Sequence, residues 1–277
     1  MTHQQGTLSS RSGCRIYTQN WQPSGTPKAV LILAHGLAEH SNRYVDIANF
    51  FTEQGFAVYA LDHEGHGHSQ GLRGYINDFD DFLSTLDQYC DEVTELHPDC
   101  KRFLIGHSMG GVISSAYLLE HQEKLSGCIL SGPALATGDV ISPIQKAIVN
   151  ILSKILPKLP LLQLEANDVC HDPAVVEAYK NDPYVFTGKI RVRLISEILR
   201  TADRVLSNAA NITLPMLLLH GGDDKMASPT GSEKLYAGIS SPDKAIKIYP
   251  GLYHEIFLEP EKLSIYAEIQ AWIEARI

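Results

Sequence analysis

The clearest chemical signal in the sequence is the five-residue motif Gly106-His-Ser-Met-Gly110. It follows the short apolar run Phe103–Ile105 and precedes a segment with helical periodicity. A serine on such a tight strand-to-helix turn projects its hydroxyl away from the sheet. The residues two before and two after it must be small, because a β-carbon there would collide with neighbouring backbone. The following helix would direct free N–H groups towards an anion formed at Ser108. The motif therefore favours a nucleophilic serine, with a Gly-rich connection as the alternative if the motif stands alone.

A serine hydroxyl is a weak acid, so it needs a histidine base that a carboxylate orients. Two later loops supply these groups: Asp223 and Asp224 follow the apolar run Met216–Leu219, and His254 follows the run Ala245–Tyr249. We predict His254 as the base. Either aspartate could be the acid, and Asp224 is favoured because it lies further past the strand end, which leaves Asp223 as a solvated or turn-forming residue. A purely structural His254 is disfavoured, because serine, acid and base appear in the order expected for this type of turn.

Acyl transfer also needs two hydrogen-bond donors for the negatively charged oxygen of the tetrahedral intermediate. The backbone N–H of Met109, directly after the serine, is the first predicted donor. The second is the N–H of Leu37, in the loop that follows the apolar run Ala29–Ala34. Because only backbone atoms take part, both side chains are free to be apolar.

The elements that must position these residues can be read from apolar runs and periodicity. Strands are predicted in two segments of residues 7–21 that join near Ser12-Gly13, and at 29–34, 56–61, 103–106, 127–130, 216–219 and 245–249. Helices are predicted at 43–54, 77–97, from the serine to about 121, and at 144–156, 173–180, 189–206, 229–238 and 260–276. This alternation is typical of an α/β fold with a mostly parallel sheet of about eight strands.

The strand signal vanishes between residues 134 and 207. We therefore predict one α/β core domain, residues 1–133 and 208–277, with an all-helical insert, residues 134–207, after the sixth strand. Residues 147–162 of this insert are very apolar with lysines interspersed. They predict a lid whose inner face lines an acyl tunnel and whose outer face makes transient contact with a membrane or micelle surface. A helix packed on the core is the alternative.

Composition narrows the class of protein. The 277 residues carry a net charge of −9, which argues against nucleic acid as a partner. The first residues lack the features of a signal peptide, no apolar stretch reaches about 18 residues, and five scattered cysteines form no CxxC pair. We expect a cytoplasmic protein, peripheral at a membrane if the insert contacts lipid.

A metal site is disfavoured, because no carboxylates accompany the histidines in a ligand arrangement; no cofactor is expected. The histidines in question are His35, His40, His63, His66 and His68.

Four segments together resemble the monoacylglycerol lipase and lysophospholipase family of the α/β-hydrolase superfamily. They are His35-Gly-Leu-Ala-Glu-His-Ser-Asn-Arg-Tyr44, Asp62-x-x-Gly-His-Gly-x-Ser-x-Gly71, Gly106-His-Ser-Met-Gly-Gly111 and Gly251-x-Tyr-His254. The resemblance implies the α/β-hydrolase fold with a helical cap. It also implies a serine hydrolase that cleaves esters of single-chain lipids, monoacylglycerols above all, through an acyl-enzyme on Ser108. The family's pattern of a strand followed by His or Gln-Gly-x-x-Asp selects Asp224 as the acid.

The resemblance also implies residues near the alcohol end of the substrate. Glu39 and Arg43 of the first segment correspond to residues near the glycerol in monoacylglycerol lipases, as does Tyr179 of the Tyr-x-x-Asp-Pro pattern. Phe257 departs from the mammalian enzymes, which have a second histidine there that contacts glycerol. This departure weakens the case for strict monoglyceride selectivity, so a lysophospholipase or a broad carboxylesterase is the alternative. A non-catalytic binding module is the more distant alternative, disfavoured by the intact serine, acid and base.

Overall fold

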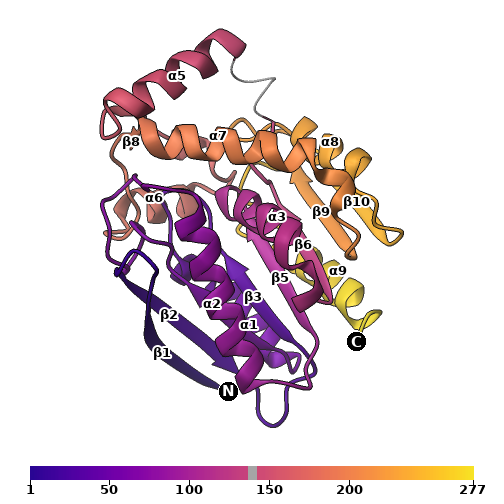
Figure 1. Ribbon diagram of the computed structural model, residues 1–277. Coiled ribbons are helices and arrows are strands. Elements are labelled where there is room, and N and C mark those ends of the chain that lie inside the picture. The colour runs from indigo at the N-terminus through magenta and orange to yellow at the C-terminus, as the bar shows by residue number, and fades with distance from the viewer. Residues whose placement is uncertain (137–141) are drawn as a thin grey trace.

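The computed structural model describes residues 1–136 and 142–277, and its centre is an eight-stranded sheet (Figure 1). The strand order is β1-β2-β4-β3-β5-β6-β9-β10. The strands are β1 (Thr2–Ser9), β2 (Arg15–Gln22), β3 (Val30–Ala34), β4 (Ala57–Leu61), β5 (Arg102–His107), β6 (Gly127–Ser131), β9 (Met216–Gly221) and β10 (Lys244–Tyr249). All neighbouring pairs from β4 to β10 are parallel, whereas β2 runs antiparallel to both β1 and β4. The predicted α/β class and mostly parallel sheet are confirmed.

The first strand is longer than the sequence pattern indicates. The expected strand begins at Thr7, but β1 begins at Thr2 and pairs with β2 along its whole length, from Thr2 opposite Gln22 to Ser9 opposite Arg15. Its first six residues are exposed, so they carry no apolar alternation from which a strand could be predicted. Backbone hydrogen bonding to β2 forms the strand instead.

Between β6 and β9, the described residues 132–136 and 142–215 contain the α-helices α5 (Pro143–Ile155), α6 (Pro173–Asn181) and α7 (Val192–Ser207). The expectation of an all-helical insert is wrong in one respect, because β7 (Pro160–Leu162) pairs with β8 (Ile190–Arg191). Strands of two and three residues are too short to show a period of two. Residues 137–141, part of the predicted insert, lie outside the described residues.

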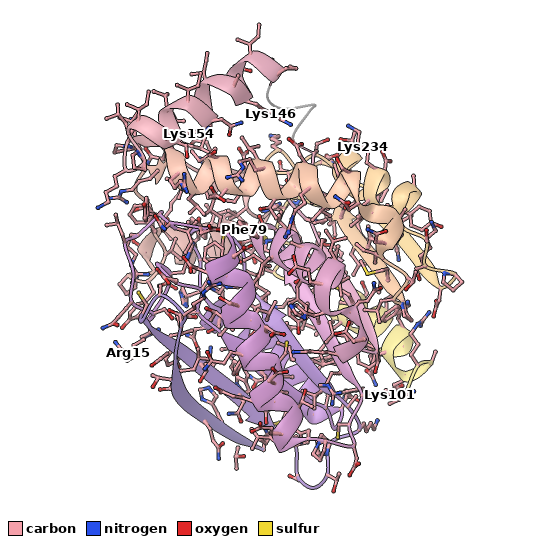
Figure 2. The ribbon with its side chains drawn as sticks, in the orientation of Figure 1. Arg15, Phe79, Lys101, Lys146, Lys154 and Lys234 are labelled. Carbon is pink, nitrogen blue, oxygen red and sulfur yellow. The ribbon has the colours of Figure 1, made fainter. Side chains whose placement is uncertain are left out.

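The helix α7 lies across the molecule between α5 and α3 (Met109–His121) (Figure 1). Figure 2 shows the Lys146 and Lys154 side chains on α5. The Lys146 ammonium lies 2.9 Å from the carboxylate of Asp203 on α7, which ties the two helices together.

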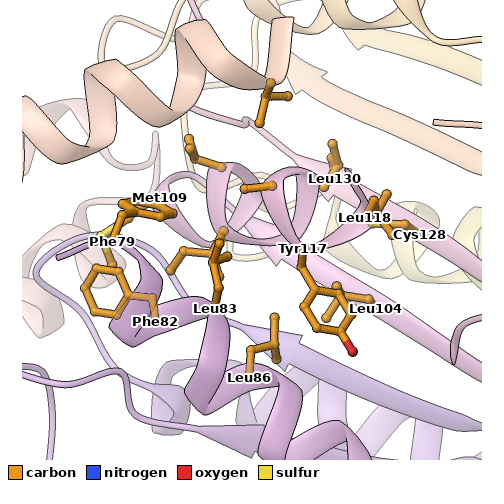
Figure 3. Close-up of a cluster of buried hydrophobic side chains, with 14 of the residues drawn as sticks. Phe79, Phe82, Leu83, Leu86, Leu104, Met109, Tyr117, Leu118, Cys128 and Leu130 are labelled. Atoms are coloured by element: carbon orange, nitrogen blue, oxygen red, sulfur yellow. The ribbon is translucent and has the colours of Figure 1, made fainter. Parts of the chain in front are cut away.

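The sheet is covered on both faces, so its central strands are apolar along their whole length. On β3, Val30 and Ile32 face one hydrophobic cluster and Leu31 and Leu33 face the other. Figure 3 shows the first cluster, formed against α2 (Asp80–Leu96) and α3. The second lies against α1 (Val45–Glu53) and α9 (Lys262–Glu274). The helix α8 (Thr230–Gly238) links β9 and β10. This packing holds the carboxyl ends of the parallel strands, where the predicted site residues lie, in fixed positions.

Candidate active site

Ser108 lies on a strained turn between β5 and α3. Its φ of 53° and ψ of −117° are unusual for a residue with a side chain. A β-carbon on Gly106 would lie 2.5 Å from the carbonyl oxygen of Gly110, and one on Gly110 would collide with the carbonyl of Ala34. The two glycines are therefore required by the close approach of backbone around the serine, as the motif predicts.

The structure brings the predicted serine, acid and base into one chain of hydrogen bonds. His254 Nε2 lies 2.9 Å from Ser108 Oγ, and His254 Nδ1 lies 2.6 Å from Asp224 Oδ2. Because an ionised carboxylate only accepts, Nδ1 carries the proton and Nε2 is left to accept the serine O–H. Asp224 and His254 come from loops that follow β9 and β10, which are neighbours in the sheet. Asp223 is exposed, and the hydrogen bond to His254 Nδ1 comes from Asp224.

Asp224 is held by more than the base. Its Oδ1 accepts the backbone N–H groups of Met226 at 2.8 Å and Ala227 at 2.9 Å. Its Oδ2 also lies 3.1 Å from Nε2 of the buried His220. Burial alone would raise the pKa of Asp224, but His254, His220 and the backbone donors outweigh burial and hold that pKa below its ordinary value. The carboxylate is therefore ionised and fixed in orientation. Sequence reasoning missed His220, although it opens the same motif as Asp224.

The electrostatic surroundings suit His254 as a base. Burial alone would lower the pKa of His254, but the charge of Asp224 and its hydrogen bond raise it above the ordinary value. The ring of His107 lies 4.7 Å from the ring of His254. Burial lowers the pKa of His107 to about 3, so this neighbour is neutral and donates Nδ1–H to the Ser131 carbonyl at 3.0 Å. His107 therefore places no second positive charge beside the imidazolium that forms on His254 during the reaction.

The two predicted oxyanion donors lie on the same cavity as Ser108. Within residues 1–136 and 142–277, no protein acceptor pairs with the N–H of Leu37 or of Met109. The loop before Leu37 is held by Glu39, whose Oε1 accepts the Gly36 N–H at 2.6 Å. Both N–H groups are thus available to a ligand beside the serine.

The cavity is open to solvent and combines a polar part with an extensive apolar part. Glu39, Tyr179 and Glu255 line it together with Ser108 and His254. Its apolar wall includes Leu162, Leu164, Ile195, Ile198, Leu199 and Met226. A cavity of this composition can take a ligand with a long apolar chain and a small polar end.

The four residues implied to lie near the alcohol end do not all reach this cavity. Glu39 and Tyr179 line it, whereas Arg43 and Phe257 line a smaller neighbouring cavity that Glu39 and Glu255 also border. The Phe257 side chain is buried in the hydrophobic cluster beneath the sheet and packs against Tyr266. An aromatic ring gains more from that packing than from a polar wall. Phe257 does not line the main cavity, and its role as a substrate contact stays a prediction. Glu255 was missed, although its position next to His254 was the available signal.

The clustered histidines do not form a metal site in the described part of the chain. Across residues 1–136 and 142–277, no three His, Cys, Asp or Glu side chains are arranged to hold a metal ion. Burial lowers the pKa of His63 and of His66, the latter to about 3, so both rings are neutral. Every helix within the same ranges is too short or too polar to span a bilayer.

The chain is similar to known hydrolases along nearly its whole length. The family described as "Serine aminopeptidase, S33" matches residues 25–261. The monoacylglycerol lipase of Mycolicibacterium smegmatis is 37% identical over 276 residues, which is 100% of this chain and 99% of that protein. The chain belongs to the monoacylglycerol lipase family of the α/β-hydrolase superfamily. Human monoglyceride lipase is also similar, at 32% identity over 97% of this chain and 90% of that protein.

Solved structures support the same assignment. The crystal structure of Paleococcus ferrophilus monoacylglycerol lipase superposes with a TM-score of 0.85 at 32% identity, over 95% of this chain and 99% of that one. The α/β-hydrolase fold implied by the sequence is thereby confirmed, and so is membership of the monoacylglycerol lipase family.

Proposed function

We propose that this ester hydrolase cleaves monoacylglycerols through an acyl-enzyme formed on Ser108. The observation that carries the proposal is the hydrogen-bonded chain from Asp224 through His254 to Ser108 at the wall of a cavity with an apolar and a polar part. The names of the relatives support the substrate class, since the chain aligns with monoacylglycerol lipases over its whole length.

The geometry supports a two-step mechanism. In the first step Ser108 Oγ attacks the ester carbonyl while His254 Nε2 accepts its proton, and Asp224 stabilises the imidazolium. The N–H groups of Leu37 and Met109 would bind the oxyanion. The imidazolium then returns the proton to the departing alcohol oxygen and leaves an acyl-serine. In the second step water attacks the acyl-serine with His254 again as base, which releases the fatty acid and restores Ser108.

We also propose that residues 134–207 form a cap over the site and that α5 contacts lipid surfaces. Four isoleucines of this helix lie at intervals of three or four residues along one face and are between 51% and 74% exposed. They are Ile144, Ile148, Ile151 and Ile155. An exposed apolar stripe of this kind is costly in water and is favoured at a lipid surface. The opposite side of the helix packs on α7.

The direct test of the hydrolase is labelling with a fluorophosphonate probe, which forms a covalent bond with an activated serine. We expect labelling of the wild-type protein and of Ser207→Ala, an exposed control, and none of Ser108→Ala. Turnover of a monoacylglycerol, a lysophosphatidylcholine and a short p-nitrophenyl ester then separates the substrate classes. If the protein is labelled but its turnover shows no preference for the monoacylglycerol, the broad carboxylesterase or the lysophospholipase is favoured. A wild-type protein that is not labelled would contradict the proposal that it is a serine hydrolase.

A further inference from the structure

Beside the catalytic chain, one guanidinium lies between two carboxylates. Arg43 Nε donates to Glu39 Oε2 at 3.2 Å, and another nitrogen of the same guanidinium donates to Glu255 Oε2. The three side chains are 7%, 4% and 7% exposed in that order. The Arg43 guanidinium also lies over the Tyr179 ring, 4.7 Å from its centre.

The two acidic residues line the main cavity, and Arg43 does not. Glu39 and Glu255 line the cavity that holds Ser108, whereas Arg43 borders only the smaller cavity behind it. A ligand in the main cavity therefore meets two acidic side chains, with their shared cation on the far side. Two carboxylates and one guanidinium leave one negative charge in excess when both acids are ionised.

The two carboxylates are not equivalent. Glu39 receives the Gly36 N–H and the Tyr44 hydroxyl, each at 2.6 Å, in addition to Arg43. Among residues 1–136 and 142–277, the only side-chain donor to Glu255 is Arg43, and no donor reaches its Oε1. Burial acts to raise the pKa of Glu39, but the Arg43 guanidinium and the Tyr44 hydrogen bond act to lower it, and the pKa lies below its ordinary value. Burial and the charge of Glu39 raise the pKa of Glu255. Glu255 is thus the carboxyl group with free hydrogen-bonding capacity towards a ligand.

We propose that Glu255, with Glu39, selects the alcohol part of the substrate by charge. The inference rests on the proposed ester hydrolysis. A neutral head group bearing hydroxyls can donate hydrogen bonds to Glu255, as glycerol does in a monoacylglycerol. A phosphate in the same place offers oxygen acceptors and negative charge to the acidic wall, which repels it in a poorly solvated site. Glu255 therefore disfavours single-chain lipids with a phosphate close to the ester.

A matched pair of substrates tests the selection. A 1-monoacylglycerol and its 3-phosphate share the acyl chain, the ester bond and the glycerol, and differ only in the phosphate. The comparison is made at about pH 9, because burial raises the pKa of Glu255 to about 7 and its carboxyl group is ionised above that value. We expect wild-type kcat/KM to favour the neutral lipid by at least about tenfold, since one like charge at close range carries that much discrimination. Glu255→Gln keeps the size of the side chain and an acceptor for Arg43 but removes the charge. It should raise the phosphate-to-neutral ratio by about tenfold.

Three controls separate the local charge of Glu255 from the shape of its side chain and from the net charge of the protein. Glu255→Asp keeps the charge and should keep the preference for the neutral lipid. Glu53→Gln removes one negative charge from an exposed position on α1 and should leave the ratio unchanged. The wild-type protein should also cleave an acyl ester of choline, with its fixed positive charge, faster than the phosphate. That measurement needs no variant to fold.

The outcomes are distinct. Hydrolysis of the monoacylglycerol with the same phosphate-to-neutral ratio in wild type and Glu255→Gln would overturn the inference and leave the proposed function intact. Equal wild-type rates on the phosphate and the choline ester would also overturn it. Failure of the wild-type protein to cleave any of these esters would instead remove the proposed function, and the inference with it.

Discussion

At the level of single residues, the carboxylate of Asp224 governs the pH range in which His254 can act as a base. The base must be neutral, and Asp224 raises the pKa of His254 above its ordinary value. Activity is therefore expected to be lost as the pH falls through this raised pKa. The exposed Asp223 makes no contact with the imidazole, so it should have little influence on that limb of the profile.

Replacing Asp224 tests this assignment. In Asp224→Asn the charge that opposes the burial effect on His254 is absent, so the acid limb of kcat/KM should move to lower pH. The amide also favours the wrong tautomer, and kcat should fall by about ten-thousandfold. A pH–rate profile of Asp224→Asn beside Asp223→Asn measures both effects. A larger loss in Asp223→Asn would transfer the acid role to Asp223.

His220 should act on the rate through Asp224. Its Nε2 faces the Asp224 carboxylate at 3.1 Å and the Ala227 carbonyl at 2.8 Å, and its Nδ1 lies 2.8 Å from Ser232 Oγ. Because both partners of Nε2 only accept, that nitrogen carries the proton and Nδ1 accepts the serine hydroxyl. His220 is therefore a positioning residue that fixes the orientation of the acid.

We expect His220→Leu to lower kcat by roughly tenfold or more, the usual worth of a hydrogen bond to a charged group. The acid limb should move to higher pH, because Asp224 then interacts more strongly with His254. His220→Gln, which restores a donor, should recover most of the activity. Thermal unfolding measured in parallel provides the control. A lowered Tm with an unchanged pH profile would indicate a structural role alone.

At the level of elements, the reactive turn depends on how closely α3 approaches β3. A β-carbon on Gly110 would overlap the carbonyl oxygens of Ala34 and His35, which are backbone atoms and cannot rotate away. The start of α3 would have to shift, and Ser108 would shift with it. The effect is one of packing geometry, because the φ of Gly110 is not in the left-handed region.

Gly110→Ala should destabilise the fold by about 1–3 kcal/mol, as overpacking of a filled site usually does. It should also abolish labelling by a fluorophosphonate probe. Gly6→Ala is a suitable control, since the added carbon meets only the Thr18 side chain, at 3.1 Å. Chemical denaturation and labelling measure the two effects. Full labelling of Gly110→Ala would show that the turn tolerates the displacement.

The exposed face of α5 is a second element with a testable role. Ile151 is 57% exposed on that face, and Leu263 on α9 is 63% exposed elsewhere on the molecule. Ile151→Gln should weaken binding to neutral phospholipid vesicles, because it removes apolar surface from the contact. Leu263→Gln should not. Vesicle flotation measures both, and equal loss in the two variants would contradict a specific role for α5.

At the level of the whole molecule, charge is distributed unevenly along the chain. Residues 134–207 hold nine basic and eight acidic side chains, whereas the remainder holds 14 basic and 24 acidic ones. The proposed cap is thus nearly neutral, whereas the rest of the chain is acidic. Contact with lipid through the cap should accordingly be apolar in origin and opposed by the field of the core when the lipid is anionic.

This distribution predicts the salt dependence of vesicle binding. At low ionic strength the protein should bind anionic vesicles more weakly than neutral ones, and added salt should remove the difference by screening the core. Flotation of the wild-type protein over a salt series measures the trend for both kinds of vesicle. Tighter binding to anionic vesicles at low salt would point to an electrostatic contact instead.

The sequence by itself determined the features that depend on short stretches of chain. The spacing of Gly106, Ser108 and Gly110 predicts the turn, because the clash it avoids lies within one strand–helix unit. The alternation of apolar runs predicts the parallel sheet and the place of the insert. The sequence pattern failed to predict short exposed elements such as the first half of β1. These residues form a strand through backbone pairing, which requires no alternation of apolar side chains.

Only the tertiary structure decided which distant groups meet. It brought Asp224 rather than Asp223 to His254, because the position of β9 beside β10 directs one side chain of the loop inwards and leaves the other in solvent. It also joined Arg43 to Glu255, 212 residues along the chain, and buried Phe257 beneath the sheet. Packing between distant elements decides burial, and burial changes the pKa of a carboxyl group. Burial and the pKa values that follow from it belong to the folded molecule and have no local signal in the sequence, whereas the place of Asp224 in its loop already favoured it as the acid.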